Sequence, residues 1–252
     1  MNDILEYFHI PKSGKTKQRI SVKEIIDQLN PTAQDKKALN SEVNSIYLEG
    51  VLDAQTLRIP SYVSDEHLYE AIYVLQVSLK TEQHFSLINE KLHAAFPNPL
   101  IIGYLIADKL RVSLAPKRIN KLTKDKSVIE SVYTTNTFVI DEKHLDFLDL
   151  LNVSKVKALS LKELYDKLTD TVYSERLIEL IGTFPRHIPK TMDLNQRIKK
   201  IEDETSILNE LKSNYKQATM MSEKMDYHMK IKNNEHEIDR FISDLKEELN
   251  NE

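Results

Sequence analysis

Two runs of basic residues are the part of this sequence best suited to binding chemistry. Lysine and arginine neutralise phosphate, and a cluster of them forms an electrostatic footprint for nucleic acid. One run lies in residues 10–23, which hold no acid, and the other in residues 109–126, where Asp125 is the lone acid. The candidate nucleic-acid-binding residues are Lys12, Lys15, Lys17, Arg19, Lys109, Arg111, Lys117, Arg118, Lys121 and Lys124. The alternative is two solvated loops, because the net charge is −4 and no aromatic residue is interleaved with the lysines.

Catalytic patterns are weak in comparison. A metal-dependent nuclease needs carboxylates on neighbouring strands and a lysine, and the nearest candidates are Glu70, Gln76 and Lys80, with an amide where a carboxylate is wanted. The eight histidines form no His-Glu-x-x-His motif, and there is no cysteine to complete a zinc site. Residues 13–16 echo the end of a phosphate-binding loop without its first glycine. We therefore expect no catalytic residue, no metal site and no cofactor.

A methionine cluster near the C-terminus is a candidate partner-binding site. Met221, Met225 and Met229 recur every four residues, which places them on one face of a helix. This spacing is typical of a packed seam between helices. The alternative is docking of a partner, for which adaptable methionine side chains are well suited.

The elements that must position these residues fall into two parts. All glycines and prolines precede Thr191, so residues 191–252 are expected to be helical. Apolar residues there recur with heptad-like spacing from Leu194 to Ala218 and again from Ile238 to Leu249. The segment is therefore a helical hairpin or a coiled coil; we favour a hairpin that turns between residues 213 and 234. Residues 183–190, with two prolines, are expected to form a linker.

The first 182 residues predict a mixed domain. Residues 1–60 are expected to be helical apart from a loop at 11–19, with one helix capped by Ser21 and Glu24 and a second that Thr32 caps and that runs to Gly50. Residues 61–140 hold strand candidates at 71–79, 100–106, 110–114, 128–133 and 137–140, with a helix at 85–96. Helices follow over 141–182, one opened by Ser160 and Glu163. The fold class is α+β or α/β, a small mixed sheet of four or five strands with flanking helices.

Composition suggests the compartment. The absence of cysteine fits a reducing environment. The acidic start lacks the apolar core of a signal peptide, and the longest apolar run, residues 100–107, is far shorter than the ~20 residues of a membrane helix. We expect a soluble, cytoplasmic protein without a membrane partner.

Several motifs together resemble a bacterial family catalogued as domain of unknown function 4391, over nearly the whole chain. The resemblance implies no catalytic residue. Members of that family tend to occur beside helicases and DNA methyltransferases in restriction-like, phage-defence neighbourhoods, which implies such proteins as partners. The motifs are Ile10-Pro11-Lys12, Lys36-Lys37 followed by Val43 and Ile46, Ile72–Leu79 ending in Lys80, Leu87–Leu92 running into Phe96-Pro97, Leu100–Leu105, Leu114–Lys117, Ser160–Tyr165 and the helical tail.

Three functions therefore stay open. The leading expectation is a non-catalytic accessory subunit of a bacterial DNA-processing or anti-phage system, acting through protein partners and nucleic acid. A divergent metal-dependent nuclease is the enzyme alternative. The third is a coiled-coil protein that pairs with a second copy through the tail.

Overall fold

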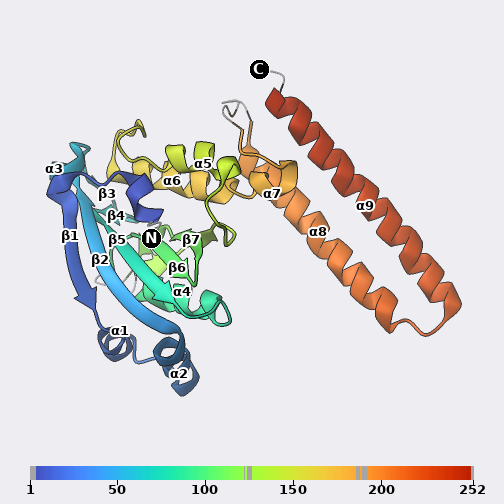
Figure 1. Ribbon diagram of the computed structural model, residues 1–252, viewed down its shortest axis with the longest axis horizontal. Coiled ribbons are helices and arrows are strands. Elements are labelled where there is room, and N and C mark those ends of the chain that lie inside the picture. Colours follow the sequence, from blue (N-terminus) through green and yellow to red (C-terminus); the bar gives the residue numbers. More distant parts are fainter. Residues whose placement is uncertain (1–3, 122, 124–126, 186–187, 189–191, 251–252) are drawn as a thin grey trace. The chain divides into compact units, whose positions relative to one another are not determined.

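The chain folds into two compact units, residues 1–175 and 176–252, which are described separately (Figure 1). The computed structural model describes residues 4–121, 123, 127–185, 188 and 192–250. The first unit holds the sheet, and the second holds the long C-terminal helices.

The first unit is built on a six-stranded mixed sheet in the order β1-β2-β5-β6-β7-β10. Only β5 and β6 pair in parallel, and α4 (Phe85–Ala95) connects them; the other neighbours are antiparallel. Two short hairpins, β3–β4 and β8–β9, lie outside this sheet. The strands are β1 (Lys15–Ile20), β2 (Val43–Asp53), β3 (Tyr62–Val63), β4 (Leu68–Tyr69), β5 (Ala71–Leu79), β6 (Leu100–Ile106), β7 (Lys109–Leu114), β8 (Lys117–Ile119), β9 (Ser127–Ile129) and β10 (Tyr133–Thr134).

Short helices begin where the sequence supplies caps. The Ser21 hydroxyl accepts from the Glu24 backbone N–H, and the Glu24 carboxylate accepts from the Ser21 N–H, as predicted. Thr32 caps the next helix, and Ser160 caps α6 through the backbone N–H of Glu163. The remaining elements of this unit are α1 (Val22–Leu29), α2 (Ala33–Glu42), α3 (Ala54–Leu57), α5 (Leu145–Leu150), α6 (Leu161–Ser174), and the 3-10 helices η1 (Ile4–Phe8), η2 (Lys12–Gly14) and η3 (Glu142–His144).

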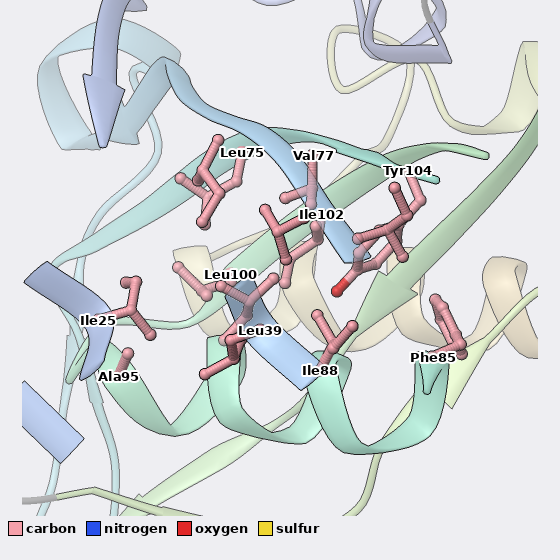
Figure 2. Close-up of a cluster of buried hydrophobic side chains, with 14 of the residues drawn as sticks. Ile25, Leu39, Leu75, Val77, Phe85, Ile88, Ala95, Leu100, Ile102 and Tyr104 are labelled. Atoms are coloured by element: carbon pink, nitrogen blue, oxygen red, sulfur yellow. The ribbon is translucent and has the colours of Figure 1, made fainter. Parts of the chain in front are cut away.

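One face of the sheet packs against α1, α2 and α4. On α4, which lies in the helix predicted at 85–96, Phe85, Ile88 and Leu92 are buried against side chains of β6 such as Ile102 and Tyr104 (Figure 2). On the opposite face, η1 lies over β6 at Gly103. A Cβ added there would lie 2.6 Å from Cγ2 of Ile4, so only glycine allows this close approach.

The sequence predictions for residues 11–50 are wrong at two places. The expected loop at 11–19 contains β1, and the expected helix ends at Glu42, where β2 begins. Ile46 and Tyr47 fit a helical period, but as β-branched and aromatic residues they also fit a strand, and β2 is paired on both sides, with β1 and β5. Long-range pairing therefore overrides the local pattern, and residues 1–60 are not a helical segment.

The central strands agree better with the sequence. Residues 71–79 and 100–106 form the buried strands β5 and β6, and α4 ends just before Pro97, as expected. A turn at 107–108 leads into β7. The predicted strand at 128–133 is instead divided between β9 and β10. Residues 137–140 contribute only one bridge, from Phe138 to Leu110. The mixed α/β class with flanking helices is confirmed.

The second unit comprises α7 (Leu177–Ile181), α8 (Leu194–Gln217) and α9 (Met221–Asn250). Gly182 ends α7 with φ +90°, as its position predicts. Helices α8 and α9 pack side by side as a hairpin, which confirms that prediction (Figure 1). The turn at residues 218–220 lies within the predicted range. Within the described part of the chain, no helix is long and apolar enough to cross a membrane.

Polar contacts fix the register of the hairpin. The Asn234 amide donates to the Glu204 carboxylate at 2.6 Å, and Arg197 pairs with Glu248 at 2.6 Å. Because a buried asparagine makes its hydrogen bond in only one alignment, it selects one register at some cost in stability.

Candidate interaction surfaces

The first basic run lies on the edge of the sheet. Lys12, in η2, and Lys15, Lys17 and Arg19, in β1, are all exposed. Strand β1 pairs only with β2, so its other side forms an edge of the sheet. The structure therefore brings these four predicted residues together along one edge, rather than in a loop.

An aromatic residue from the neighbouring strand completes this surface. Tyr47 on β2 lies directly opposite Arg19, so both side chains project from the same face of the sheet. The Lys17 ammonium lies 5.9 Å from the centre of the Tyr47 ring. Ile46, the residue before Tyr47, is in the core under α4, so Tyr47 faces away from α1, α2 and α4.

Gln76 on β5 extends the same surface. It pairs with Tyr47 across the β2–β5 ladder and therefore shares its face. Its Oε1 is buried, and no described residue donates a hydrogen bond to it, which is uncommon in a folded protein and marks a position of interest. We refer to Lys17, Arg19, Tyr47 and Gln76 as the basic face.

The second basic run does not form a common surface. Lys109 is exposed at the start of β7, and Arg118 is half-buried on β8. The Lys121 ammonium pairs with Glu66 at 3.3 Å. Arg111 is half-buried, with its guanidinium carbon 3.8 Å from the centre of the Phe85 ring. Lys124 lies outside the described residues.

Lys117 is buried, which removes it from any surface that could meet a phosphate. Its ammonium donates to three backbone carbonyls, those of His93 at 2.6 Å, Phe96 at 2.6 Å and Asn98 at 2.8 Å. These carbonyls belong to the C-terminal end of α4 and the loop after it, where a cation is favourable. Burial lowers the pKa of Lys117 to about 7. The side chain therefore supports the α4–β6 connection, which its place in a basic run did not suggest.

The residues considered for a nuclease are not brought together. Glu70 precedes β5 and Gln76 lies six residues later, so the extended strand separates them by ~20 Å at ~3.3 Å per residue. The Lys80 ammonium donates to the carbonyl of Ser41 at 2.6 Å. Among the residues that the structure describes, no group of three or more histidines and carboxylates could hold a metal ion.

The methionine cluster lies in solvent. The exposed fractions are 74% for Met221, 60% for Met225 and 59% for Met229. The interpretation as a packed seam is therefore wrong for the isolated chain, whose seam uses residues such as Ile231 and Leu245 instead. We refer to Met221, Met225 and Met229 as the methionine stripe. It occupies the part of α9 next to the turn at 218–220.

The sequence analysis did not place Tyr47 or Gln76 beside the basic run, and it considered Gln76 only for a nuclease, because both residues reach Lys17 and Arg19 only through strand pairing. One sequence signal was present: basic residues at 15, 17 and 19 alternate, as they would on one face of a strand. No comparable signal distinguishes Lys117 from its exposed neighbours.

Comparison with known proteins places most of the chain within a family. The model of a family described as "Domain of unknown function (DUF4391)" matches residues 8–238. Searches of curated proteins and of solved structures each return no match. The matched range includes the basic face and the methionine stripe, and it confirms the family resemblance inferred from the motifs.

Proposed function

Since the chain belongs to the DUF4391 family, we propose that it is a non-catalytic accessory subunit of a bacterial DNA-processing or anti-phage system. In this role the basic face binds nucleic acid, and the methionine stripe binds a protein of the same system, such as a helicase or a DNA methyltransferase. The observation that carries the proposal is the basic face, where two exposed cations flank an aromatic ring.

The chemistry of this face suits a single strand. A nucleic-acid base can stack on an aromatic side chain whatever its identity, while neighbouring cations neutralise the phosphates. Tyr47 supplies the ring, and Lys17 and Arg19 supply the charges on the same side of the sheet. Lys12 and Lys15 continue the positive charge along the edge.

Charge reversal tests the nucleic-acid role. We expect Lys17→Glu/Arg19→Glu to weaken binding of a fluorescent single-stranded oligonucleotide, measured by anisotropy over a range of salt concentrations. Loss of two phosphate contacts should make the dependence of the logarithm of the binding constant on the logarithm of the salt concentration shallower, with a slope smaller in magnitude by about 1.4. The matched control is Lys23→Glu/Lys37→Glu, which makes the same charge change at exposed positions on α1 and α2.

The comparison between the two double variants decides the outcome. Equal loss of affinity in both would show a general charge effect and would contradict a specific role for the basic face. Tyr47→Leu should also weaken binding, by ~1–3 kcal/mol if one base stacks on the ring, without changing the salt slope. Cleavage of the oligonucleotide in Mg²⁺ would instead favour the nuclease alternative.

The methionine stripe supports the protein-binding part of the proposal. Three adaptable apolar side chains, each more than half exposed, are costly to leave in water, and such a patch is typical of a docking surface. Its i, i+4, i+8 spacing forms one ridge along α9, which can pack into the groove of another helix. A helical surface of the partner protein is therefore its expected occupant.

Affinity purification from a native host tests this part. Wild-type protein is expected to retain a helicase or methyltransferase of the neighbouring genes, and Met225→Glu/Met229→Glu is expected to lose it. Asn233→Glu/Ser243→Glu, at exposed positions elsewhere on α9, is the control. Retention of the partner by both variants would contradict the docking role. A wild-type dimer that the methionine variant abolishes would assign the stripe to self-association instead.

A further inference from the structure

A pocket of about 530 Å³ lies beside the N-terminal end of α4, and no residue of the basic face lines it. Its walls come from α4, β7, β9 and β10 and from the residues between the last two. The volume is within the range of ~300–1,000 Å³ usual for small-molecule sites. Arg111, which the sequence analysis selected as a phosphate-binding residue, lines it.

The Arg111 guanidinium is held in a fixed plane at the pocket wall. It stacks on Phe85, with 3.8 Å from its central carbon to the ring centre. Its Nη2 also donates to the Thr134 hydroxyl at 3.2 Å. A planar, oriented guanidinium presents paired N–H groups that match the oxygens of a phosphate or carboxylate.

The start of α4 adds further donors. No side chain caps this helix, and Ser86, its second residue, lines the pocket. The N–H of Phe85, the first residue of α4, donates to the Glu82 carbonyl at 3.0 Å. The helix N-terminus still carries partial positive charge, which favours an anion.

One turn further along, Asn89 supplies an independent indication of a ligand. Asn89 lines the same pocket although only 2% of the residue is exposed. Its Oδ1 accepts a hydrogen bond from the Tyr104 hydroxyl at 2.8 Å, which orients the amide. Within the described residues, the hydrogen bond found for the Asn89 side chain is the one that its Oδ1 accepts. The amide is thus oriented at the pocket wall, with its Nδ2 left to donate to a bound molecule.

Two carboxylates limit the kind of anion. Glu90 and Glu130 also line the pocket and are exposed. They would repel a polyphosphate, but they can accept hydrogen bonds from hydroxyl or amino groups of a ligand. The complementary ligand thus combines one terminal anionic group with hydrogen-bond donors, in a volume that holds a mononucleotide.

We propose that this pocket binds a phosphate monoester of nucleotide size, with the phosphate between Arg111, Asn89 and the N-terminus of α4. The sugar or base then donates to Glu90 and Glu130. The same chemistry exists in a free nucleoside monophosphate and in the 5′-phosphorylated end of a nucleic acid.

Calorimetric titration with adenosine monophosphate, and with matched oligonucleotides that carry or lack a 5′-phosphate, distinguishes these two sources. Saturable binding of adenosine monophosphate, with equal binding of the two oligonucleotides, assigns the pocket to a small metabolite. Phosphate-dependent tightening of the oligonucleotide assigns it to a strand end. No binding of the monophosphate, together with equal binding of both oligonucleotides, overturns the proposal.

Ser86→Glu separates binding from folding. An acid in the first turn stabilises a helix N-terminus, so the melting temperature should be kept or raised, while affinity for the phosphate monoester should fall by about tenfold or more. The control is Gln34→Glu, which places an acid at the second position of α2, away from the pocket. Arg111→Lys, which keeps the charge but not the planar group, should also weaken binding. Unchanged affinity for the phosphate monoester in both Ser86→Glu and Arg111→Lys would refute the pocket as a binding site. If oligonucleotide binding is then weakened only by Lys17→Glu/Arg19→Glu, the nucleic-acid role of the basic face is kept and the pocket proposal alone fails.

Discussion

Replacement of the buried Lys117 by methionine is the most direct test of the physical reasoning about the first unit. Methionine keeps the apolar stem and removes only the ammonium. The three carbonyls of His93, Phe96 and Asn98 then lose their common donor. We expect the end of α4 and its connection to β6 to lose stability, with no change at the basic face.

The magnitude follows from two opposing terms. A buried polar group left without a partner costs ~1–3 kcal/mol, so three carbonyls amount to ~3–9 kcal/mol. Removal of a buried ammonium relieves a desolvation cost of several kcal/mol. We therefore expect Lys117→Met to lower the free energy of unfolding by a net ~2–4 kcal/mol.

Urea unfolding followed by near-ultraviolet circular dichroism is a suitable assay. The buried tyrosines Tyr69, Tyr104 and Tyr165 all belong to the first unit, so their signal reports that unit rather than the hairpin. Lys23→Met, at an exposed position on α1, serves as the control. A change below ~0.5 kcal/mol in Lys117→Met, the range of ordinary surface substitutions, would show that the carbonyls do not depend on the lysine.

The pH dependence gives a second measurement of the same residue. Burial lowers the pKa of Lys117 to about 7, whereas a lysine in an unfolded chain keeps its proton to about pH 10.4. Between these values the unfolded state binds the extra proton, so the wild-type free energy of unfolding rises with pH. The difference between wild type and Lys117→Met should therefore widen from pH 7 to pH 9. A constant difference would contradict the lowered pKa.

Two further predictions concern the packing around the sheet. Burial, with a smaller contribution from Lys117, lowers the pKa of His93 to about 3, so the unfolded state alone takes up a proton as the pH falls below about 6.5. The free energy of unfolding should then drop by about 2 kcal/mol between pH 7 and pH 5, and His93→Gln should remove that drop in urea titrations. Gly103→Ala would place a methyl group 2.6 Å from Ile4 and should lower stability by ~1–3 kcal/mol in thermal melts. In Gly182→Ala no atom of a described residue lies within 4 Å of the added group, so only strain at φ +90° of order 1 kcal/mol is expected. A larger effect there than at Gly103 would refute the packing argument.

The elements that could be predicted from sequence are those with local signals. Ser21 and Glu24, which lie within four residues of each other, predict the start of a helix, and the glycine-free tail predicts long helices. Strand β1 gave a weaker signal, because Lys-Thr-Lys-Gln-Arg alternates basic and polar residues but lacks the apolar alternation of a half-buried strand. Its existence depends on β2, which lies more than twenty residues away along the chain.

The candidate surfaces show the same limit. Residue type correctly placed Lys15, Lys17 and Arg19 at the surface, but it placed Lys117 there as well. A lysine becomes buried when a particular set of carbonyls surrounds it, and that set is created by the end of α4, about twenty residues earlier. The exposure of the methionine stripe likewise follows from which face of α9 meets α8, a choice that periodicity left open.

The charges on β1 have a second consequence, for solubility. An outer strand presents free backbone N–H and C=O groups that another chain can extend into a continuous intermolecular sheet. Lysine and arginine side chains along that border repel an identical border on an approaching molecule. Replacing Lys15, Lys17 and Arg19 by neutral residues would thus remove this repulsion and favour aggregation through the edge strand, whatever ligand the strand binds.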